Sequence, residues 1–433
     1  MCYSRSDCII NFSFGFFLIS KLCEKLKRFK VQLEAFMWSC GDESIRNLWS
    51  LDSDTVFLNH GSYGAVPLRV RREYSSIQDQ IEKNPVRFLS RDLPERLMTT
   101  RHYVAQRLNV DPQGLVFVSN ATSGVGAVLS SLPFTKGDEI VFHNHGYGWV
   151  RQGLQNLARN KGVVVREAVI PMFPKSNDEI VAAFAQHLGQ KTKLIVCDHV
   201  TSPTALVFPV QEIVELAHGR GIPVLVDGAH APGLLELNLQ KTAADFYTGN
   251  FHKWVCAPRG SAFLSVAPEW RNVVRPQSLS YSGGVTHHLW DDAFVGYFDW
   301  TGTSDPAAWL SVPEAYRFHD ELGWQKVFSG RKSLLSEGSR VYLNKLGFSQ
   351  NEICDSSLLA AMITLPLPLL EGVAVDAAGA KQLTRSIYEK FKIEIPAICF
   401  DGKLFVRASA QIYNRIGDFE RLADAIGEMS GAY

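Results

Sequence analysis

The chain has no surplus of charge, no paired cysteines and no long apolar run, and each absence excludes a class of protein. Lys plus Arg and Asp plus Glu both number 44 among the 433 residues. A general nucleic-acid binder needs excess positive charge, so that function is not expected. The eight cysteines are scattered without a CxxC pair, which argues against a zinc ribbon or a disulfide framework. We therefore expect no metal site, and a reducing compartment, the cytoplasm.

The N-terminal residues differ in composition from the rest of the chain. Residues 9–19 are mostly apolar and a basic stretch follows them, but the apolar run is about half of the roughly 20 residues that cross a bilayer. The run lacks a preceding positive segment and a small-residue cleavage site after it. We interpret residues 1–36 as an extension outside the fold, with Met37 as an alternative start, and we expect no membrane association. A signal or anchor is the alternative interpretation.

Strand and helix patterns alternate in the middle of the chain. Short apolar runs predict strands at 115–120, 138–143, 162–168, 194–199, 223–227, 245–248 and 260–266. Amphipathic patterns predict helices at 121–129, 147–160 and 210–218. This order is typical of an α/β fold with a parallel or mixed sheet that helices cover on both faces. Ligands of such sheets bind beyond the carboxyl ends of the strands, so polar residues that end strands are the candidates for function.

The first such strand end is the segment 120–124, with the sequence NATSG. Small residues and hydroxyls at a helix N-terminus are suited to bind a phosphate, because free N–H groups and the helix dipole meet there. Neither GxGxxG nor GxxxxGK[ST] occurs here, so a dinucleotide fold and a P-loop are not supported. The alternative is an ordinary capped helix.

The second strand end carries Asp227, with His230 three residues later. An acidic residue there can hold a cationic group, although a turn cap is an equal alternative. Lys253 lies among apolar and aromatic residues in GNFHKW, and such surroundings lower the pKa of a lysine and give a nucleophilic amine. A single lysine is otherwise most often a surface residue. Arg407, between apolar residues, is a candidate carboxylate clamp or a partner of a structural acid.

These features together indicate one cofactor, pyridoxal 5′-phosphate (PLP). The turn would bind the phosphate, and Lys253 would form the internal Schiff base. Asp227 would keep the pyridine nitrogen protonated, so that the ring accepts electrons. Arg407 would orient an amino-acid substrate by its carboxylate.

Several ordered motifs resemble the fold-type I PLP enzymes of the class V aminotransferase group, and most closely its isopenicillin N epimerase-like branch. The resemblance covers residues 56–426. Its motifs are FLNHGSYG (57–64), NPVRF (84–88), NATSG (120–124), DHVTSPTALVFPV (198–210), VDGAHAPG (226–233), GNFHKW (249–254) and VRASAQIYN (406–414). The group also contains cysteine desulfurases and kynureninase-like enzymes.

The resemblance implies roles for residues inside these motifs. Lys253, Asp227 and Tyr147 would be catalytic, and Tyr147 would stack on the ring, with His145 as the alternative. Further cofactor contacts would come from Ala121 and Thr122 in the phosphate turn, Asn250 and His252 at the phosphate, Ser202 and His230 near the phenolic oxygen, and Thr303 at the phosphate of the neighbouring subunit. Substrate contacts would come from Arg407, and from Asn59, His60 and Arg87 on segments that close over the site.

The resemblance also implies the architecture. We expect a large PLP-binding domain at 61–310 with a mostly parallel seven-stranded sheet, preceded by a segment at 37–60. A smaller C-terminal α/β domain is expected at 311–433. A homodimer with a shared active site follows from the role implied for Thr303.

We expect the reaction to proceed through removal of the Cα proton of an amino acid. For β-elimination, this amino acid would contain sulfur. The outcome is epimerisation or β-elimination, as in a C–S lyase. Cys399 lies among apolar residues eight positions before Arg407, so we interpret it as a buried packing residue and not as the mobile-loop cysteine of a desulfurase. A class V aminotransferase is the alternative enzyme, and a non-catalytic binding protein on the same fold is the alternative from another class.

Overall fold

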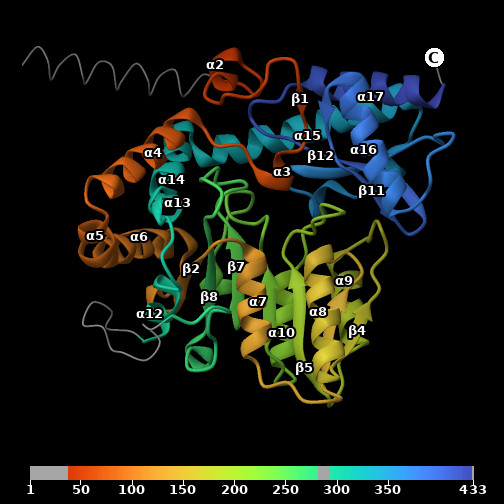
Figure 1. Ribbon diagram of the computed structural model, residues 1–433. Coiled ribbons are helices and arrows are strands. Elements are labelled where there is room, and N and C mark those ends of the chain that lie inside the picture. The colour runs from red at the N-terminus through yellow and green to blue at the C-terminus, as the bar shows by residue number, and fades with distance from the viewer. Residues whose placement is uncertain (1–37, 281–292, 432–433) are drawn as a thin grey trace, which may run out of the picture.

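The computed structural model describes residues 38–280 and 293–431. Its centre is a seven-stranded sheet with the order β2-β8-β7-β6-β5-β3-β4 (Figure 1). The strands in that order are β2 (Leu115–Val118), β8 (Ala262–Val266), β7 (Phe246–Asn250), β6 (Val224–Asp227), β5 (Thr192–Asp198), β3 (Glu139–His143) and β4 (Val164–Ala168). Pairing is parallel from β7 to β4, and β8 is antiparallel to both of its neighbours. The mostly parallel seven-stranded sheet is therefore confirmed.

The strands bury side chains on both faces, which explains why their sequences are continuously apolar. On β2, Val116 and Val118 belong to one buried cluster, and Leu115 and Phe117 belong to the other. The first cluster includes residues of α7 (Ala121–Ser131), α8 (Gly148–Lys161) and α12 (Ala293–Asp299). The second includes residues of α6 (Leu93–Leu108), α9 (Asn177–Ala185), α10 (Val210–His218) and α14 (Val312–Leu322). Helices thus cover both faces, as the alternation predicts.

A smaller C-terminal unit packs beside the large sheet. Its antiparallel sheet has the order β11-β12-β9, from β11 (Ala397–Phe400), β12 (Lys403–Ser409) and β9 (Met362–Pro366). Its helices are α15 (Trp324–Leu346), α16 (Ala377–Phe391) and α17 (Ile416–Ser430). Other helices are α2 (Glu43–Arg46), α3 (His60–Tyr63), α4 (Leu68–Lys83), α5 (Pro85–Arg87), α11 (Leu239–Thr242) and α13 (Ala307–Leu310).

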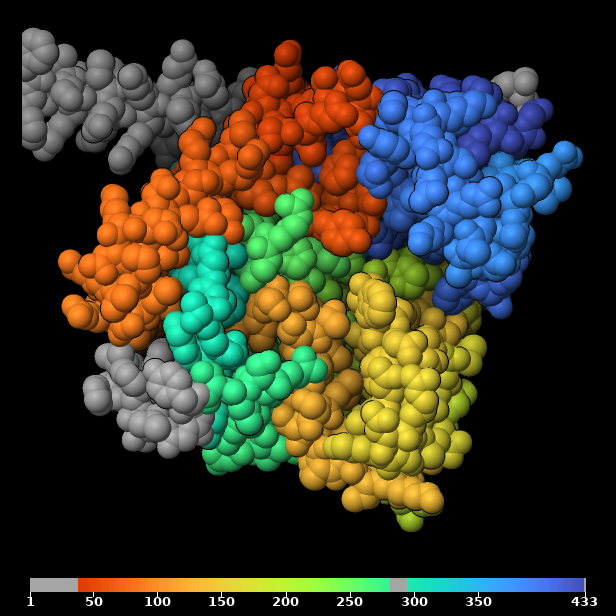
Figure 2. All heavy atoms as spheres, viewed as in Figure 1, coloured from red at the N-terminus to blue at the C-terminus, as the bar shows by residue number. Residues whose placement is uncertain are grey.

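The N-terminal segment is joined to the C-terminal unit by main-chain hydrogen bonds. Strand β1 (Val56–Phe57) runs parallel to β10 (Ile393–Glu394), and the N–H of Ser409 donates to the carbonyl of Leu58 at 2.8 Å. Figure 2 shows the red N-terminal residues beside the blue C-terminal ones. The segment between β1 and α4 is therefore fixed by residues from the far end of the chain.

The expectations for residues 1–36 lie outside the described residues. Within the described ranges, no helix is both long and apolar enough to cross a membrane. The boundary predicted near residue 310 coincides with the end of α13, and the division into domains stays a prediction.

Candidate active site

The largest cluster of predicted site residues surrounds one cavity of about 610 Å³, here called the main cavity. It lies at the carboxyl ends of β5, β6 and β7, where a ligand of an α/β sheet is expected. Nine predicted residues line it: Ala121, Thr122, Tyr147, Ser202, Asp227, His230, Asn250, His252 and Lys253. They come from segments up to 132 positions apart in the chain, and the family resemblance implied most of their roles.

One wall of the main cavity is the N-terminus of α7. The side chain of Asn120 accepts a hydrogen bond from the N–H of Ser123 and caps the helix, while Oδ1 of Asn250 accepts one from the N–H of Ala121 at 2.8 Å. Gly124 lets the helix approach β7, since a Cβ at this position would lie 2.3 Å from Oγ1 of Thr248. The helix end is therefore held against the sheet with its positive dipole towards the cavity.

Two observations in this wall fit a phosphate group. The first N–H groups of a helix have no partners within the helix. In addition, Nδ1 of His252 is buried and has no hydrogen-bond partner among the described residues, although His252 lines the cavity. An unpaired buried nitrogen is costly unless a ligand satisfies it, so the residues present are suited to hold the phosphate of PLP.

Lys253 is buried in the main cavity, and its Nζ lies 3.0 Å from Nε2 of His230. The other ring nitrogen of His230 accepts a hydrogen bond from the indole N–H of Trp254 at 3.5 Å. A neutral imidazole then carries its proton on Nε2 and donates it to Nζ. Lys253 can accept that hydrogen bond only as a neutral amine. Burial, followed by the charge of Arg407, lowers the pKa of Lys253 to about 7, so the geometry and the electrostatics agree.

Asp227 ends β6 and faces the same cavity. It is buried, and its Oδ1 accepts a hydrogen bond from the N–H of Ala229 at 3.0 Å. Burial, followed by the charge of Asp198, raises the pKa of the Asp227 carboxyl. A cation placed against this carboxyl would offset the cost of ionising it there.

Asp198 is a cavity residue that no sequence argument singled out. It ends β5 as Asp227 ends β6, and the two are register partners on parallel strands. The rule that polar strand ends mark the site would have found it. Ser62, Tyr63, Trp149 and Arg259 also line the cavity, and no signal in the sequence distinguished them from ordinary surface residues.

Arg407 stands on β12 behind the cavity lining and reaches it through two serines. One terminal nitrogen donates to the carbonyl of Ser202, and the other donates to Oγ of Ser62 at 3.1 Å and to Oδ1 of Asn59 at 3.4 Å. These acceptors are neutral, and Nε has no partner among the described residues. Burial lowers the pKa of Arg407 to about 10. A buried guanidinium whose hydrogen-bonded partners are all uncharged is prepared for an anion.

Of the two candidates for ring stacking, Tyr147 lines the main cavity and His145 does not. His145 is fixed in the protein interior, because its ring nitrogens contact Oγ1 of Thr204 at 2.7 Å and the carbonyl of Ile170 at 2.9 Å. Tyr147 is half-buried, and burial raises its pKa. The position favours Tyr147, and its stacking role stays a prediction.

Besides Arg407, four predicted residues do not line the main cavity. His60 is buried behind it, with Nε2 2.9 Å from the carbonyl oxygen of Lys253 and Nδ1 2.8 Å from the hydroxyl of Tyr413. Asn59 contacts Arg407. Arg87 is exposed and pairs with Asp92 at 3.5 Å, and Thr303 is exposed in the loop before α13. Direct substrate or cofactor contacts by these four stay predictions.

Cys399 is less buried than its interpretation as a packing residue predicts. It is partly exposed on β11, opposite Leu404 of β12, because this strand lies at the edge of the small sheet. It does not line the main cavity.

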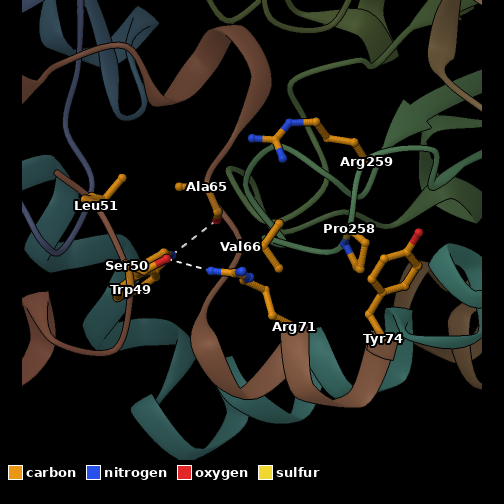
Figure 3. Close-up of a pocket in the computed structure, with 9 residues that line it drawn as sticks. All are labelled: Trp49, Ser50, Leu51, Ala65, Val66, Arg71, Tyr74, Pro258 and Arg259. Atoms are coloured by element: carbon orange, nitrogen blue, oxygen red, sulfur yellow. Dashed lines mark hydrogen bonds between the residues drawn. The ribbon is translucent and has the colours of Figure 1, made fainter. Parts of the chain in front are cut away.

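A second cavity of about 450 Å³ lies next to the main one and shares Arg259 with it. Figure 3 shows Arg71 of α4 and Arg259 beside this cavity, with a bond from Arg71 to Oγ of Ser50 at 2.7 Å. No lysine, histidine or carboxylate lines it, so the groups that can move a proton near neutral pH are in the main cavity. No group of three or more metal-ligating side chains occurs in residues 38–280 and 293–431.

The chain resembles known proteins of one family. The family described as aminotransferase class-V matches residues 65–367. The chain belongs to this family. It is 32% identical to an isopenicillin N epimerase of Streptomyces clavuligerus over 398 residues, which cover 90% of this chain and 98% of that protein. It is 30% identical to a probable chloroplastic L-cysteine desulfhydrase of Arabidopsis thaliana over 408 residues, covering 87% of this chain and 83% of that protein.

Solved structures show the same fold. The cystine C–S lyase C-DES, in complex with its product cysteine persulfide, matches with a TM-score of 0.74 at 20% identity, covering 87% of this chain and 98% of its own. A lysine variant of C-DES, with glycine covalently linked to its PLP cofactor, gives a TM-score of 0.73. The class-V protein described here is thus related to isopenicillin N epimerases and cysteine desulfhydrases, and it has the fold-type I architecture of cysteine desulfurases and C–S lyases.

Proposed function

We propose that this protein is a PLP-dependent enzyme that removes the Cα proton of an amino acid, as an epimerase or as a C–S lyase. The observation that carries the proposal is the buried amine of Lys253 at 3.0 Å from Nε2 of His230, in a cavity shared with Asp227 and the α7 N-terminus. The relatives support both outcomes, because they include epimerases and desulfhydrases.

Each part of the site has a distinct task in this proposal. Bound PLP would supply an electron sink next to Cα. Arg407 binds and orients the substrate carboxylate. Lys253 holds the cofactor and then accepts the Cα proton, for which a pKa near neutrality is suitable. Ionised Asp227 holds the ring nitrogen, and the α7 turn with Asn250 and His252 binds the phosphate.

The second proton donor decides between the two outcomes. Epimerisation needs an acid on the face opposite Lys253, and elimination needs an acid for the leaving thiol. Tyr147 faces the cavity, and burial keeps it protonated near neutral pH by raising its pKa. His145 and His60 are committed to contacts in the wall. We therefore propose Tyr147 for this role.

The experiment compares Lys253→Ala with Lys193→Ala, a lysine exposed on β5. The first variant is expected to lose the visible absorption of PLP-reconstituted protein and all turnover, whereas the second keeps both. Retention of colour and turnover by Lys253→Ala would refute the proposal.

Substrate tests then separate the reactions. Pyruvate released from cysteine or its conjugates without an added keto acid indicates elimination. Deuterium incorporated at Cα with inversion indicates epimerisation, and strict dependence on a keto acid indicates the aminotransferase. Protein that never binds PLP would support the non-catalytic alternative. We also propose a homodimer in which Thr303 reaches the partner's cavity, and analytical ultracentrifugation tests it.

A further inference from the structure

Asp198 and His143 form a buried pair at the edge of the main cavity to which the proposed chemistry gives no task. His143 ends β3 and is fully buried, and its Nε2 lies 3.2 Å from Oδ1 of Asp198. Phe142, Phe184 and Phe208 lie around the imidazole ring, with centroids between 4.9 and 5.9 Å away. These apolar surroundings are a poor environment for an imidazolium, so His143 is neutral.

The main chain fixes the tautomer of His143. The ladder between β3 and β5 stops at the pair Val141 and Ile195, and beyond it the N–H of Asp198 donates to Nε2 of His143 at 3.1 Å. A nitrogen that accepts this bond carries no proton, so the proton of the neutral ring is on Nδ1. Nδ1 has no hydrogen-bond partner among the described residues, so the hydrogen bonds of Nε2 set the orientation of the ring.

The contact between Nε2 and the carboxyl of Asp198 then requires a proton on the carboxyl. An ionised carboxylate and an unprotonated Nε2 are both acceptors and would repel at 3.2 Å. A protonated carboxyl resolves the conflict by donating to Nε2, whose single lone pair is then shared between the O–H and the N–H of Asp198, at 3.2 and 3.1 Å. The register pairing of Asp198 with Asp227 adds a second reason, because adjacent buried carboxyls cannot both ionise cheaply.

We propose that Asp198 is a positioning residue that acts as a neutral carboxylic acid, donating to His143 and leaving Asp227 as the ionised carboxylate for the cofactor ring. This rests on the proposed function for the role of Asp227. The charge on the cofactor side of the cavity is thereby limited to one carboxylate, and strand ends β3 and β5 are joined where their ladder stops.

The charged and titratable groups around Asp198 come from β6, α8 and the segment after β7. A charge on Asp198 would raise the pKa of Asp227 of β6, so ionisation of both carboxyls is disfavoured. Lys253 after β7 and Arg151 of α8 favour ionisation, as does the main-chain N–H of Ser202, but burial outweighs them and raises the pKa of Asp198 to about 8. The electrostatics therefore agree with the hydrogen-bond geometry.

The test uses Asp198→Asn, whose amide donates to Nε2 as the neutral acid does. Asp227→Asn is the matched control on the neighbouring strand. We expect Asp198→Asn to bind PLP with near-wild-type affinity and Asp227→Asn to bind about 30-fold or more weakly. Loss of PLP binding by Asp198→Asn equal to that of Asp227→Asn would overturn the proposal. Wild-type binding by Asp227→Asn would instead refute the role of Asp227, and the infrared measurement would still decide on Asp198.

The infrared readout needs neither cofactor nor turnover. The cofactor-free wild type should show the carbonyl band of a protonated carboxylic acid at pH 6, and the band should be absent or reduced in Asp198→Asn. Wild-type protein without any such band at pH 6 would overturn the proposal, and this measurement holds even if the variant does not fold.

Stability provides the third readout. Because the folded pKa of Asp198 is raised above its unfolded value, its contribution to stability is complete below about pH 4 and is lost as the pH rises towards about 8. The melting temperature of Asp198→Asn minus that of the wild type should therefore increase from pH 5 to pH 8. A difference that does not change with pH would show that Asp198 is already ionised.

Discussion

Replacement of Arg407 by methionine should weaken catalysis and leave the fold as stable as before or more stable. The guanidinium is buried, its acceptors are a carbonyl, two hydroxyls and an amide oxygen, and its Nε has no partner among the described residues. A buried charge without a counter-ion costs free energy that apolar packing does not. Even a complete buried ion pair can often be exchanged for apolar residues of similar volume with a neutral or stabilising effect of about 1–4 kcal/mol, and Arg407 has no counter-ion among its hydrogen-bond partners.

Catalysis by Arg407→Met should decrease, although its stability should not. Loss of one partner of a buried, hydrogen-bonded charge pair costs about 2–5 kcal/mol, so kcat/KM should fall about 30- to 4,000-fold. PLP absorbance should be retained, because Arg407 is not in the phosphate wall. Since the charge of Arg407 lowers the pKa of Lys253, the variant should also shift the acidic limb of the pH profile to higher pH.

The assay combines steady-state kinetics with thermal unfolding of the same samples, and Arg407→Lys is the control that keeps the charge without the planar fork. We expect Arg407→Lys to lie between the wild type and Arg407→Met in kcat/KM. A kcat/KM within about tenfold of the wild type for Arg407→Met would refute the role as a carboxylate clamp. A clear fall in its melting temperature would refute the argument from an uncompensated charge.

Two further predictions concern stability and the phosphate wall. Burial lowers the pKa of His319 to about 3, so its contribution to stability is complete above its unfolded pKa of about 6.5 and is lost as the pH falls. His319→Phe keeps the stacking on Trp324 and should reduce the pH dependence of the urea-unfolding free energy between pH 6.5 and 4. Wild-type and variant curves displaced equally at every pH would contradict this. Gly124→Ala should destabilise the protein by about 1–3 kcal/mol and weaken PLP binding, because its Cβ would meet Thr248. Gly153→Ala on α8, with open space around the new Cβ, should be neutral or stabilising by up to about 1 kcal/mol, and equal effects of the two substitutions would refute the packing argument.

Local patterns predicted the large sheet because its strands are short, apolar and separated by helices. Asp227 and Lys253 could be proposed for the same reason, since strand ends in such sheets meet at one edge. No local pattern shows that His60 is buried behind Lys253, because this position depends on Tyr413 from the other end of the chain. Its predicted role on a segment that closes over the site therefore could not be judged from the sequence. Asp198 also ends a strand, so the same rule reaches its position, but its contact with His143, 55 residues earlier, is not visible in any local pattern.

The pairing of β1 with β10 has a consequence for how the protein is made. The carbonyl of Glu394 accepts the N–H of Leu58, and Oγ of Ser409 accepts the N–H of Gly61. The segment that carries Ser62 and Tyr63 therefore lacks these bonds to the C-terminal unit until the ribosome has delivered nearly the whole polypeptide, although His60 can already contact the carbonyl of Lys253. At about 5–20 residues per second, a nascent chain spends many seconds with its central sheet complete and this segment without its C-terminal bonds, so the wall that holds Ser62 is completed only at the last stage of synthesis.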